Sequence, residues 1–493
     1  MATTNDKEMF PPNNAYNAAL PIWQKCRDTS AGEDALHARD QETAGTYLRP
    51  LNPANTSAAN QAKNEAYILM ARYQNFVGST KSGFLGMAYR KAPVVPNLPD
   101  RMKYLIENVD GTGLSLEQQS RSTLSEVIEV GRSGLLCDMP ANNGGTVKNE
   151  QDGMRPSIVP YCAESIVDWF PLTPSASDPL QYVILKESAT EKVDGEFEHE
   201  SITVYRVLHM IDGNYHQTVY KSDSKGIFAS GDAGVETQIY AANNAPMKSI
   251  PFSFVGSINN SPSIDKPIIL DIANASLGMY QEDANLRVSS FGFSAGTMTI
   301  ADDRYQQGLR NKDDPSKPQA VAMGDGMALV MGSGGKAEII SPPDNPLAAK
   351  IKDTDQKNLA ELGAQVVMIS GGPTVIVEVE SRNSVNASKL TVAVVNVSAA
   401  YNQQLMWCAE FLGVTIPETE KFKVNTDFFS AEYSPEQVTA LIAQFQGQLI
   451  SKAEAQKSLQ KAGNISAETD LKKMNDEIVQ QSTGNVSFDD GGE

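Results

Sequence analysis

Two long helical patterns, separated by an insertion at 293–344, constrain the fold of this 493-residue chain more than any other feature. The first pattern starts near Pro267, a residue type favoured at the first helical position, and runs to about Ser290. The second starts at Asn345, an N-cap residue followed by proline, and ends near Met368, before a Gly-Gly-Pro stop. At 1.5 Å per residue, each helix would be roughly 35 Å long. We expect short strands and turns in the insertion.

The part of the chain before about residue 160 reads as mostly helical. Apolar residues recur at spacings of three and four over 15–27, 55–84 and 116–130, which predicts three helices. A Gly-Arg-Ser-Gly turn at 131–134 would then lead into a strand at 135–138.

From about residue 156 to 256 the pattern changes to strands. β-rich runs cover 181–187, 202–210 and 215–220, and the dipeptide Asp212-Gly213 between the last two is a hairpin signal. We expect an antiparallel β subdomain, closed by the segment 249–255. Helices and antiparallel strands in separate stretches predict the α+β fold class.

The C-terminal part predicts further helices. A third long helix should extend from about 386 to Gly413, although its β-branched run at 391–397 is also compatible with a strand. Residues 431–482 read as a small helical module, and 483–493 as a disordered acidic tail. The first helix of the module should bury one apolar face, formed by Val438, Leu441, Ile442, Phe445 and Leu449.

The charge balance excludes several classes of protein. Lys and Arg total 41 against 60 Asp and Glu, a formal net charge of −19. A protein that binds nucleic acid through its main surface must neutralise phosphates with basic residues. The acidic net charge therefore argues against this class of protein. No apolar run approaches 18 residues, and the N-terminus lacks the basic and apolar regions of a signal peptide, so we expect no membrane span and no secretion.

No catalytic signature is present in the sequence, so we predict no catalytic residues, no metal ligands and no cofactor. The glycine-rich stretch 332–336 lacks the first glycine of a P-loop and the hydroxyl residue that should follow its lysine. None of the four histidines forms an HExxH pair: His37, His199, His209 and His216. The cysteines are scattered, which predicts four buried thiols in a reducing compartment: Cys26, Cys137, Cys162 and Cys408.

Four phrases, in order along the chain, resemble the portal proteins of tailed bacteriophages, which form the ring at the capsid vertex through which DNA passes. They are ALPIWQKCRD at 19–28, GFLGMAYRKAP at 83–93, IPFSFVG at 250–256 with KPIILD at 266–271, and ELGAQ at 361–365. Each phrase alone is weak, but their order and the helix–insertion–helix pattern make the resemblance specific. It covers nearly the whole chain.

The resemblance implies an architecture for each stretch. Residues 1–262 with 386–430 would form a wing, and 431–482 a helical crown. The stem would comprise the helices at 263–292 and 345–368, with the clip at 293–344 between them and a tunnel loop at 369–385. Such subunits would assemble into a cyclic ring of about twelve copies, a dodecamer.

The resemblance also implies partners and a location in the virion, at the portal vertex, after assembly in the cytoplasm of a bacterial host. These partners are the double-stranded DNA that crosses the channel during genome packaging and ejection, the terminase large subunit, head-completion or adaptor and tail proteins, and the major capsid protein with a possible scaffold. Alternatives are another head–tail connector, although adaptors are usually far shorter, and an acidic soluble metal-dependent enzyme.

Candidate contact residues follow from this architecture. Lys350, Lys357 and Arg382 would face DNA in the channel, and Arg304, Arg310 and Lys312 in the insertion would dock the packaging motor or adaptor. The stretch 301–352 contains seven basic and seven acidic residues and is therefore neutral in an acidic chain. Ion pairs of Lys350 with Asp353 and of Lys357 with Glu361, on a solvated helix face, are the competing interpretation for the two lysines.

Overall fold

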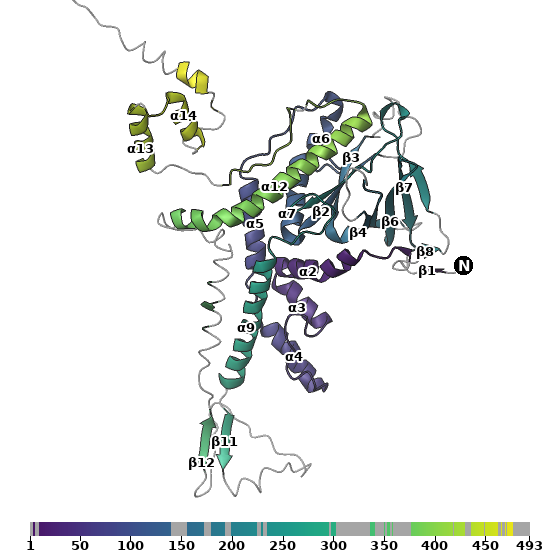
Figure 1. Cartoon of the computed structure of the whole chain (residues 1–493). Helices are drawn as coiled ribbons and strands as arrows, with labels where there is room; N and C mark the ends of the chain where they lie inside the picture. The colour runs from purple at the N-terminus through teal and green to yellow at the C-terminus, as the bar shows by residue number, and fades with distance from the viewer. Residues whose placement is uncertain are drawn as a thin grey trace, which may run out of the picture. The chain divides into compact units, whose positions relative to one another are not determined.

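The computed structural model divides the chain into two units (Figure 1). Unit 1 comprises Met1–Gly86 and Pro93–Val424, and unit 2 comprises Met87–Ala92 and Asn425–Glu493. The residues that the structure describes are 3–4, 9–139, 155–171, 179–192, 199–223, 228–229, 234–294, 297–301, 336–340, 350, 353–354, 357, 376–417, 419–428, 435–447, 449–461, 465, 469 and 471–476. Among the helices in these ranges, none is long and apolar enough to cross a membrane.

The N-terminal part of the chain is helical, as predicted. Its helices are α2 (Asn14–Ala31), α3 (Glu33–Glu42), α4 (Ala58–Met70), α5 (Phe76–Ala88), η1 (Asp100–Met102), α6 (Tyr104–Glu107) and α7 (Leu116–Val130). Helix α2 starts where the Asn13 side chain accepts a hydrogen bond from the Ala15 N–H, at 2.9 Å, and it continues through Pro21. Helix α7 has the bounds that the sequence predicted.

The single helix predicted over 55–84 is wrong, because the chain between α4 and α5 leaves the helical path. There the backbone N–H of Arg72 donates to Asp283 at 3.2 Å, and that of Tyr73 donates to Glu33 at 2.8 Å. These acceptors come from other helices and replace the helical carbonyls. The apolar spacing continues on both sides of the break, so periodicity alone did not reveal it.

A three-stranded antiparallel sheet follows α7, in the order β10-β2-β3. Its strands are β2 (Arg132–Asp138), β3 (Ser157–Cys162) and β10 (Phe252–Gly256). The predicted turn at 131–134 is therefore wrong beyond Gly131, which alone has the left-handed conformation, with φ of 76°. Segment 249–255 also does not close the larger β subdomain, because β10 pairs with β2 in this separate sheet.

The β-rich runs belong to an antiparallel sheet, as predicted, which has five strands in sequential order. Its strands are β4 (Ile166–Phe170), β5 (Tyr182–Lys192), β6 (His199–Ile211), β7 (Asn214–Lys221) and β9 (Val235–Gln238). Asp212 and Gly213 both have positive φ, 49° and 74°, at the β6–β7 turn, which confirms the hairpin signal. The remaining short elements here are the pair β1 (Thr3–Thr4) and β8 (Phe228–Ala229), and the turns η2 (Ala163–Ser165) and η3 (Ala242–Asn244).

Helix α12 (Ile376–Leu412) packs, together with α7, on the three-stranded sheet (Figure 1). The run 391–397 is helical, because its apolar face is buried against β2, β10 and α7. The tunnel loop predicted over 369–385 is wrong for residues 376–385, which belong to this helix. After Pro373 no glycine or proline is present to stop the helix before its predicted start.

Helix α9 (Leu270–Ser294) corresponds to the first predicted stem helix. It leads into β11 (Thr297–Ala301), which pairs antiparallel with β12 (Lys336–Ile340), so the insertion contains strands as expected. Residues 302–335 lie outside the described ones. Of the helix predicted at 345–368, the described positions 350, 353–354 and 357 are helical.

Unit 2 contains α13 (Pro435–Gln446), α14 (Lys452–Lys461) and a helical segment at 471–476. Ser451 and Glu454 exchange hydrogen bonds at 3.2 and 3.3 Å, which form a capping box at the start of α14. The prediction of a buried face on α13 is wrong among the described residues: the side chains of Ile442, Phe445 and Leu449 are exposed. The predicted tail at 483–493 lies outside the described residues.

Candidate functional site

The six residues predicted from the sequence to contact DNA or partners are described to different extents. Lys350 and Lys357 have helical backbones and exposed side chains. Arg382 lies in α12 and not in a loop, and only its backbone is described. Arg304, Arg310 and Lys312 lie outside the described residues. The channel and docking roles of all six stay predictions.

A hydrogen-bond network holds α12 against α7 and β2. The Tyr401 hydroxyl lies 2.9 Å from the Thr123 hydroxyl and donates to the Gln119 carboxamide oxygen at 3.0 Å. One turn further, the Gln404 carboxamide donates to the Leu135 carbonyl of β2 at 2.8 Å. These groups are buried, so each bond that they make avoids an unsatisfied polar atom in the core. The network sets both the position and the rotation of α12.

The rotation set in this way leaves an uncharged stripe of α12 on the surface. Between residues 392 and 406 the exposed positions recur every three or four residues. They are Val392, Val395, Ala399, Gln403 and Met406, and we call them the α12 stripe. Val395 and Met406 are 50% and 61% exposed. Because α12 already buries its opposite face, the α12 stripe is surface that the fold of unit 1 does not need.

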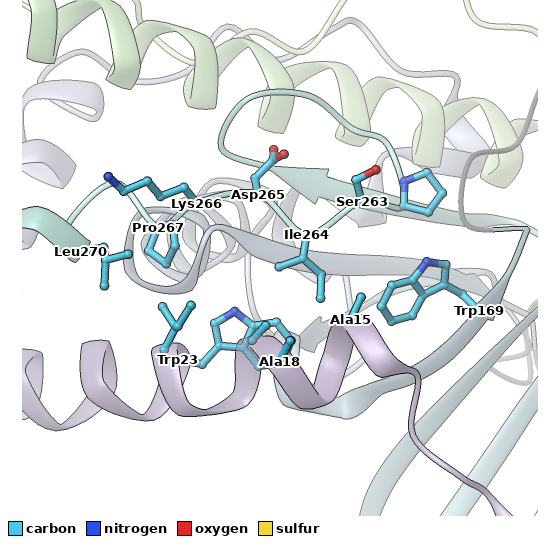
Figure 2. Close-up of a pocket in the computed structure, with 13 residues that line it drawn as sticks. Ala15, Ala18, Trp23, Trp169, Ser263, Ile264, Asp265, Lys266, Pro267 and Leu270 are labelled. Carbon is cyan, nitrogen blue, oxygen red and sulfur yellow. The ribbon is translucent and has the colours of Figure 1, made fainter. Parts of the chain in front are cut away.

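An apolar groove of about 500 Å³ lies beside α2. Figure 2 shows Ala15, Ala18 and Trp23 of α2 on one side, the segment 262–267 on the other, and Trp169 at one end. The charged groups in this wall are already paired, because Asp265 accepts two backbone N–H groups and Lys266 contacts Asp271 at 2.7 Å. The groove therefore offers mainly apolar surface.

Behind Trp169 lies a buried guanidinium. Arg132 is 1% exposed, and its guanidinium carbon lies 4.0 Å from the centre of the Trp169 ring and 4.7 Å from that of Phe254. One of its nitrogens donates to the Pro262 carbonyl at 2.6 Å, and among the described residues the other two have no hydrogen-bond acceptor. Burial lowers the pKa of Arg132 to about 9, against a smaller opposing effect of Asp265. The two aromatic faces stabilise its charge through cation–π contacts.

Arg27 of α2 binds three glutamates from α7 and η2. Its guanidinium donates to Glu126 at 2.8 Å, to Glu129 at 2.9 Å and to Glu164 at 2.8 Å. Lys81 of α5 adds a second cation, 2.8 Å from Glu129. Burial disfavours the charge on Arg27, but its hydrogen bonds to Glu126 and Glu164 outweigh this and raise the pKa of Arg27.

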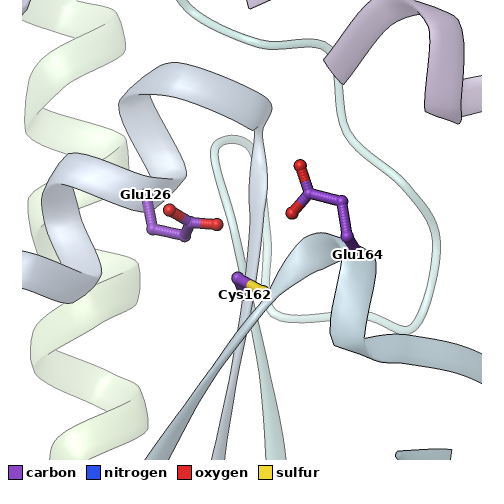
Figure 3. A group of neighbouring side chains, drawn as sticks. All are labelled: Glu126, Cys162 and Glu164. Carbon is purple, nitrogen blue, oxygen red and sulfur yellow. The ribbon is translucent and has the colours of Figure 1, made fainter. Parts of the chain in front are cut away.

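Two of these glutamates belong to the one group, within the described residues, whose atoms could together ligate a metal ion. Figure 3 shows it: Glu126, Cys162 and Glu164, with ligand atoms within 4.8 Å of one another. Both carboxylates already accept hydrogen bonds from Arg27, whose positive charge repels a metal cation. The group therefore fits an ion-pair cluster better than a metal site. Cys162 is exposed, which corrects the prediction of four buried thiols, whereas Cys26, Cys137 and Cys408 are buried.

The sequence alone does not indicate Arg27, Arg132 or the groove as candidate site features. Arg27 lies next to Cys26 on a predicted helix, but no periodicity indicates which glutamates it meets across the fold. Arg132 was assigned to a turn, and a charged residue at the start of a buried strand gives no local signal of burial. The groove is formed by α2, Trp169 and the segment 262–267, which are far apart in the sequence. The only sequence signal for it is the row of apolar residues along α2.

A family model described as a domain of unknown function (DUF4055) matches residues 268–412, from the segment before α9 to the end of α12. No curated protein matches the sequence.

Two solved structures are similar to the chain over 78% of its length and 90% of theirs. One is the neck of a native GTA particle computed with C12 symmetry, with 11% identity and a TM-score of 0.33. The other is the neck of an empty GTA particle computed with C6 symmetry, with 10% identity and a TM-score of 0.38.

Proposed function

We propose that this chain is a portal protein and not an enzyme. About twelve copies would form a ring at one vertex of a phage-like capsid. Double-stranded DNA would enter and leave through the centre of the ring. The terminase large subunit would dock on it during packaging, and head-completion and tail proteins would bind it afterwards.

The observation that carries this proposal is the element at α9, β11 and β12. Helix α9 has 25 residues and is therefore roughly 37 Å long. Two residues after its end the chain enters β11, whose partner β12 starts 35 positions after the end of β11, because 336 − 301 = 35. A long helix that ends in a paired insertion supports the stem-and-clip assignment, which the sequence phrases independently favour.

The α12 stripe supports assembly. Five neighbouring exposed positions without charge, three of them Val or Met, are surface that a monomer has no reason to keep apolar. A head-to-tail contact repeated around an axis closes into a ring. We assign the α12 stripe to the contact between neighbouring subunits.

The net charge of −19 supports a conduit in place of a tight DNA-binding surface. Each basic residue on a phosphate adds affinity that opposes sliding, whereas an acidic or neutral lumen repels the duplex and keeps it centred. Lys350 and Lys357, which are exposed on helical backbone, are the described bases that we assign to the channel. The clip residues Arg304, Arg310 and Lys312 would serve docking.

Measuring the mass and shape of the purified full-length protein tests the ring. Light scattering should give a particle of about twelve times 53.3 kDa, and negative-stain microscopy should show rings with a central hole. The measurement should cover dilute protein, concentrated protein and protein mixed with capsid components. A compact dimer or tetramer without a hole, or a monomer under all three conditions, would overturn the proposal.

Two sets of charge reversals test the separate roles proposed for the docking residues and for the channel residues. Reversing Arg304, Arg310 and Lys312 to Glu should abolish co-sedimentation of the terminase large subunit and leave ring mass unchanged. Reversing Lys350 and Lys357 to Glu should leave terminase binding and ring mass unchanged and should slow the packaging of DNA. Equal loss of terminase binding in both sets would contradict the clip assignment.

A further inference from the structure

Two buried cysteines from distant parts of unit 1 meet in its core. Cys137 lies on β2 and Cys408 on α12, 271 positions apart, and their sulfur atoms are 3.2 Å from each other. Cys137 is 1% exposed and Cys408 is 0% exposed. The thiols therefore contact each other across the interface between the sheet and its covering helix.

The backbone around the two cysteines is firmly positioned. The N–H of Cys137 donates to the Pro251 carbonyl at 2.9 Å. One turn before Cys408, Gln404 donates to the Leu135 carbonyl at 2.8 Å, which holds α12 on β2. A disulfide has a sulfur–sulfur distance of about 2.05 Å, so closing the bond needs the two sulfur atoms to approach each other by roughly 1.1 Å.

We propose that Cys137 and Cys408 can form a disulfide bond. Both would be free thiols in a reducing cytoplasm, and a small neutral peroxide would oxidise them to the disulfide once the protein has left the cytoplasm. One thiol would reduce hydrogen peroxide to water and become a sulfenic acid. The second thiol would attack that sulfur and release a second water, so two thiols and one peroxide give one disulfide and two waters. The product would join β2 to α12 covalently. The proposal uses unit 1 alone and does not depend on the portal assignment.

The chemistry of the site explains why the bond would be conditional. Burial is the largest effect on the Cys137 thiol, and it raises its pKa, as does the neighbouring Cys408. A protonated buried thiol is a poor nucleophile and is closed to bulky reagents. A small uncharged oxidant that enters during local opening meets two thiols already in contact. Oxidation should therefore be slow and should give one defined product.

Peptide mapping of the full-length protein tests the proposal. After treatment with hydrogen peroxide, the protein is denatured in an alkylating reagent and digested without reductant. We expect a linked peptide pair that contains Cys137 and Cys408, with Cys26 alkylated as a free thiol. If both Cys137 and Cys408 are recovered alkylated, or linked only to other cysteines, the proposal is overturned. The wild-type chain suffices for this measurement.

Thermal unfolding gives a second readout. The link closes a very long loop, so peroxide treatment should raise the Tm of unit 1 by about 5 °C, and a reductant should reverse the rise. The variant Cys408→Ser should show no rise, and Cys26→Ser, which changes another buried thiol, should keep it. An unchanged Tm in oxidised wild type would argue against a bond in the native fold.

Discussion

Asn402 and Phe422 exchange two hydrogen bonds. The Asn402 carboxamide donates to the Phe422 carbonyl, and the Phe422 N–H donates to the Asn402 carboxamide oxygen, both at 2.8 Å. The pairing imitates that of two β-strands, with a helical side chain in place of one strand. It fixes the segment after α12 against the helix, and Val424 adds a bond to the Ser398 hydroxyl at 3.1 Å.

Asn402→Ala should lower the free energy of unfolding by about 2 to 3 kcal/mol, because it leaves a backbone donor and acceptor of Phe422 without partners. Chemical denaturation measures this. Gln61→Ala is the control, since Gln61 is an exposed carboxamide of helix α4 outside the α12 stripe, and it should cost less than about 0.5 kcal/mol. Equal effects of the two substitutions would contradict the assigned role.

Gly131→Ala should destabilise the protein by more than a glycine substitution at a turn normally does. A Cβ at Gly131 would lie 2.5 Å from the Asp265 carbonyl oxygen, in addition to the cost of its φ of 76°. Gly213 has a similar φ of 74°, and a Cβ there would have no atom within 4 Å, so Gly213→Ala isolates the cost of conformation, about 1 kcal/mol. Denaturation midpoints should fall clearly further for Gly131→Ala. If the midpoints of the two variants coincide, the close approach of residue 131 to Asp265 does not contribute to the loss of stability.

Arg27→Gln should have a pH-dependent effect. Burial alone would raise the pKa of Glu164, but hydrogen bonding to Arg27 outweighs it and holds this pKa below its usual range. A depressed carboxyl pKa stabilises the fold above the unfolded pKa of about 4.3, and the contribution disappears as pH falls through the folded pKa. The free energy of unfolding of Arg27→Gln should therefore be about 2 to 4 kcal/mol below that of wild type at pH 7, and the difference should be much smaller near pH 3.

Denaturation of both proteins across this pH range checks the prediction for Arg27. Arg72→Gln is a suitable control, because Arg72 is 61% exposed in its ion pair with Glu33 and should contribute less than about 1 kcal/mol. A difference between wild type and Arg27→Gln that stays constant from pH 7 to pH 3 would show that the cluster acts through packing and not through charge.

Val395→Glu combined with Met406→Glu should prevent ring assembly and leave the subunit folded. Two carboxylates on the α12 stripe would have to be buried without partners in the subunit contact, which costs several kcal/mol per interface. Light scattering and circular dichroism together measure the outcome. Ala66→Glu, at an exposed position of α4, is the control and should assemble normally. Rings formed by the double variant would exclude the α12 stripe as the contact.

The sequence predicted local structure well wherever one segment contains its own signal. The bounds of α7 followed from its apolar spacing and the Gly131 stop, and the β6–β7 turn followed from Asp212-Gly213. The helical state of 391–397 was also expected, on the length of the pattern. The first two depend on residues within about 20 positions of one another, whereas the helix at 391–397 is also stabilised by burial against β2, β10 and α7.

The remaining features depend on partners distant in sequence. The break between α4 and α5 is stabilised by Asp283 and Glu33, which no reading of 55–84 could include. The glutamates around Arg27 come from two other elements, and the pairing of β10 with β2 joins segments more than 100 residues apart. The apolar face of α13 shows the converse, since amphipathic spacing predicts burial without indicating what covers the face.

The network between α7 and α12 has a consequence for biosynthesis. Gln119 and Tyr401 are separated by 282 positions, so the helix that covers β2 and β10 is translated long after those strands. From Gly256, the end of β10, to Tyr401 there are 401 − 256 = 145 positions, so at ordinary elongation rates the delay is roughly 7 to 29 seconds. During that interval the nascent chain exposes an apolar sheet face on the ribosome. Its yield in cells should therefore depend on chaperone capacity and on translation speed between β10 and the end of α12.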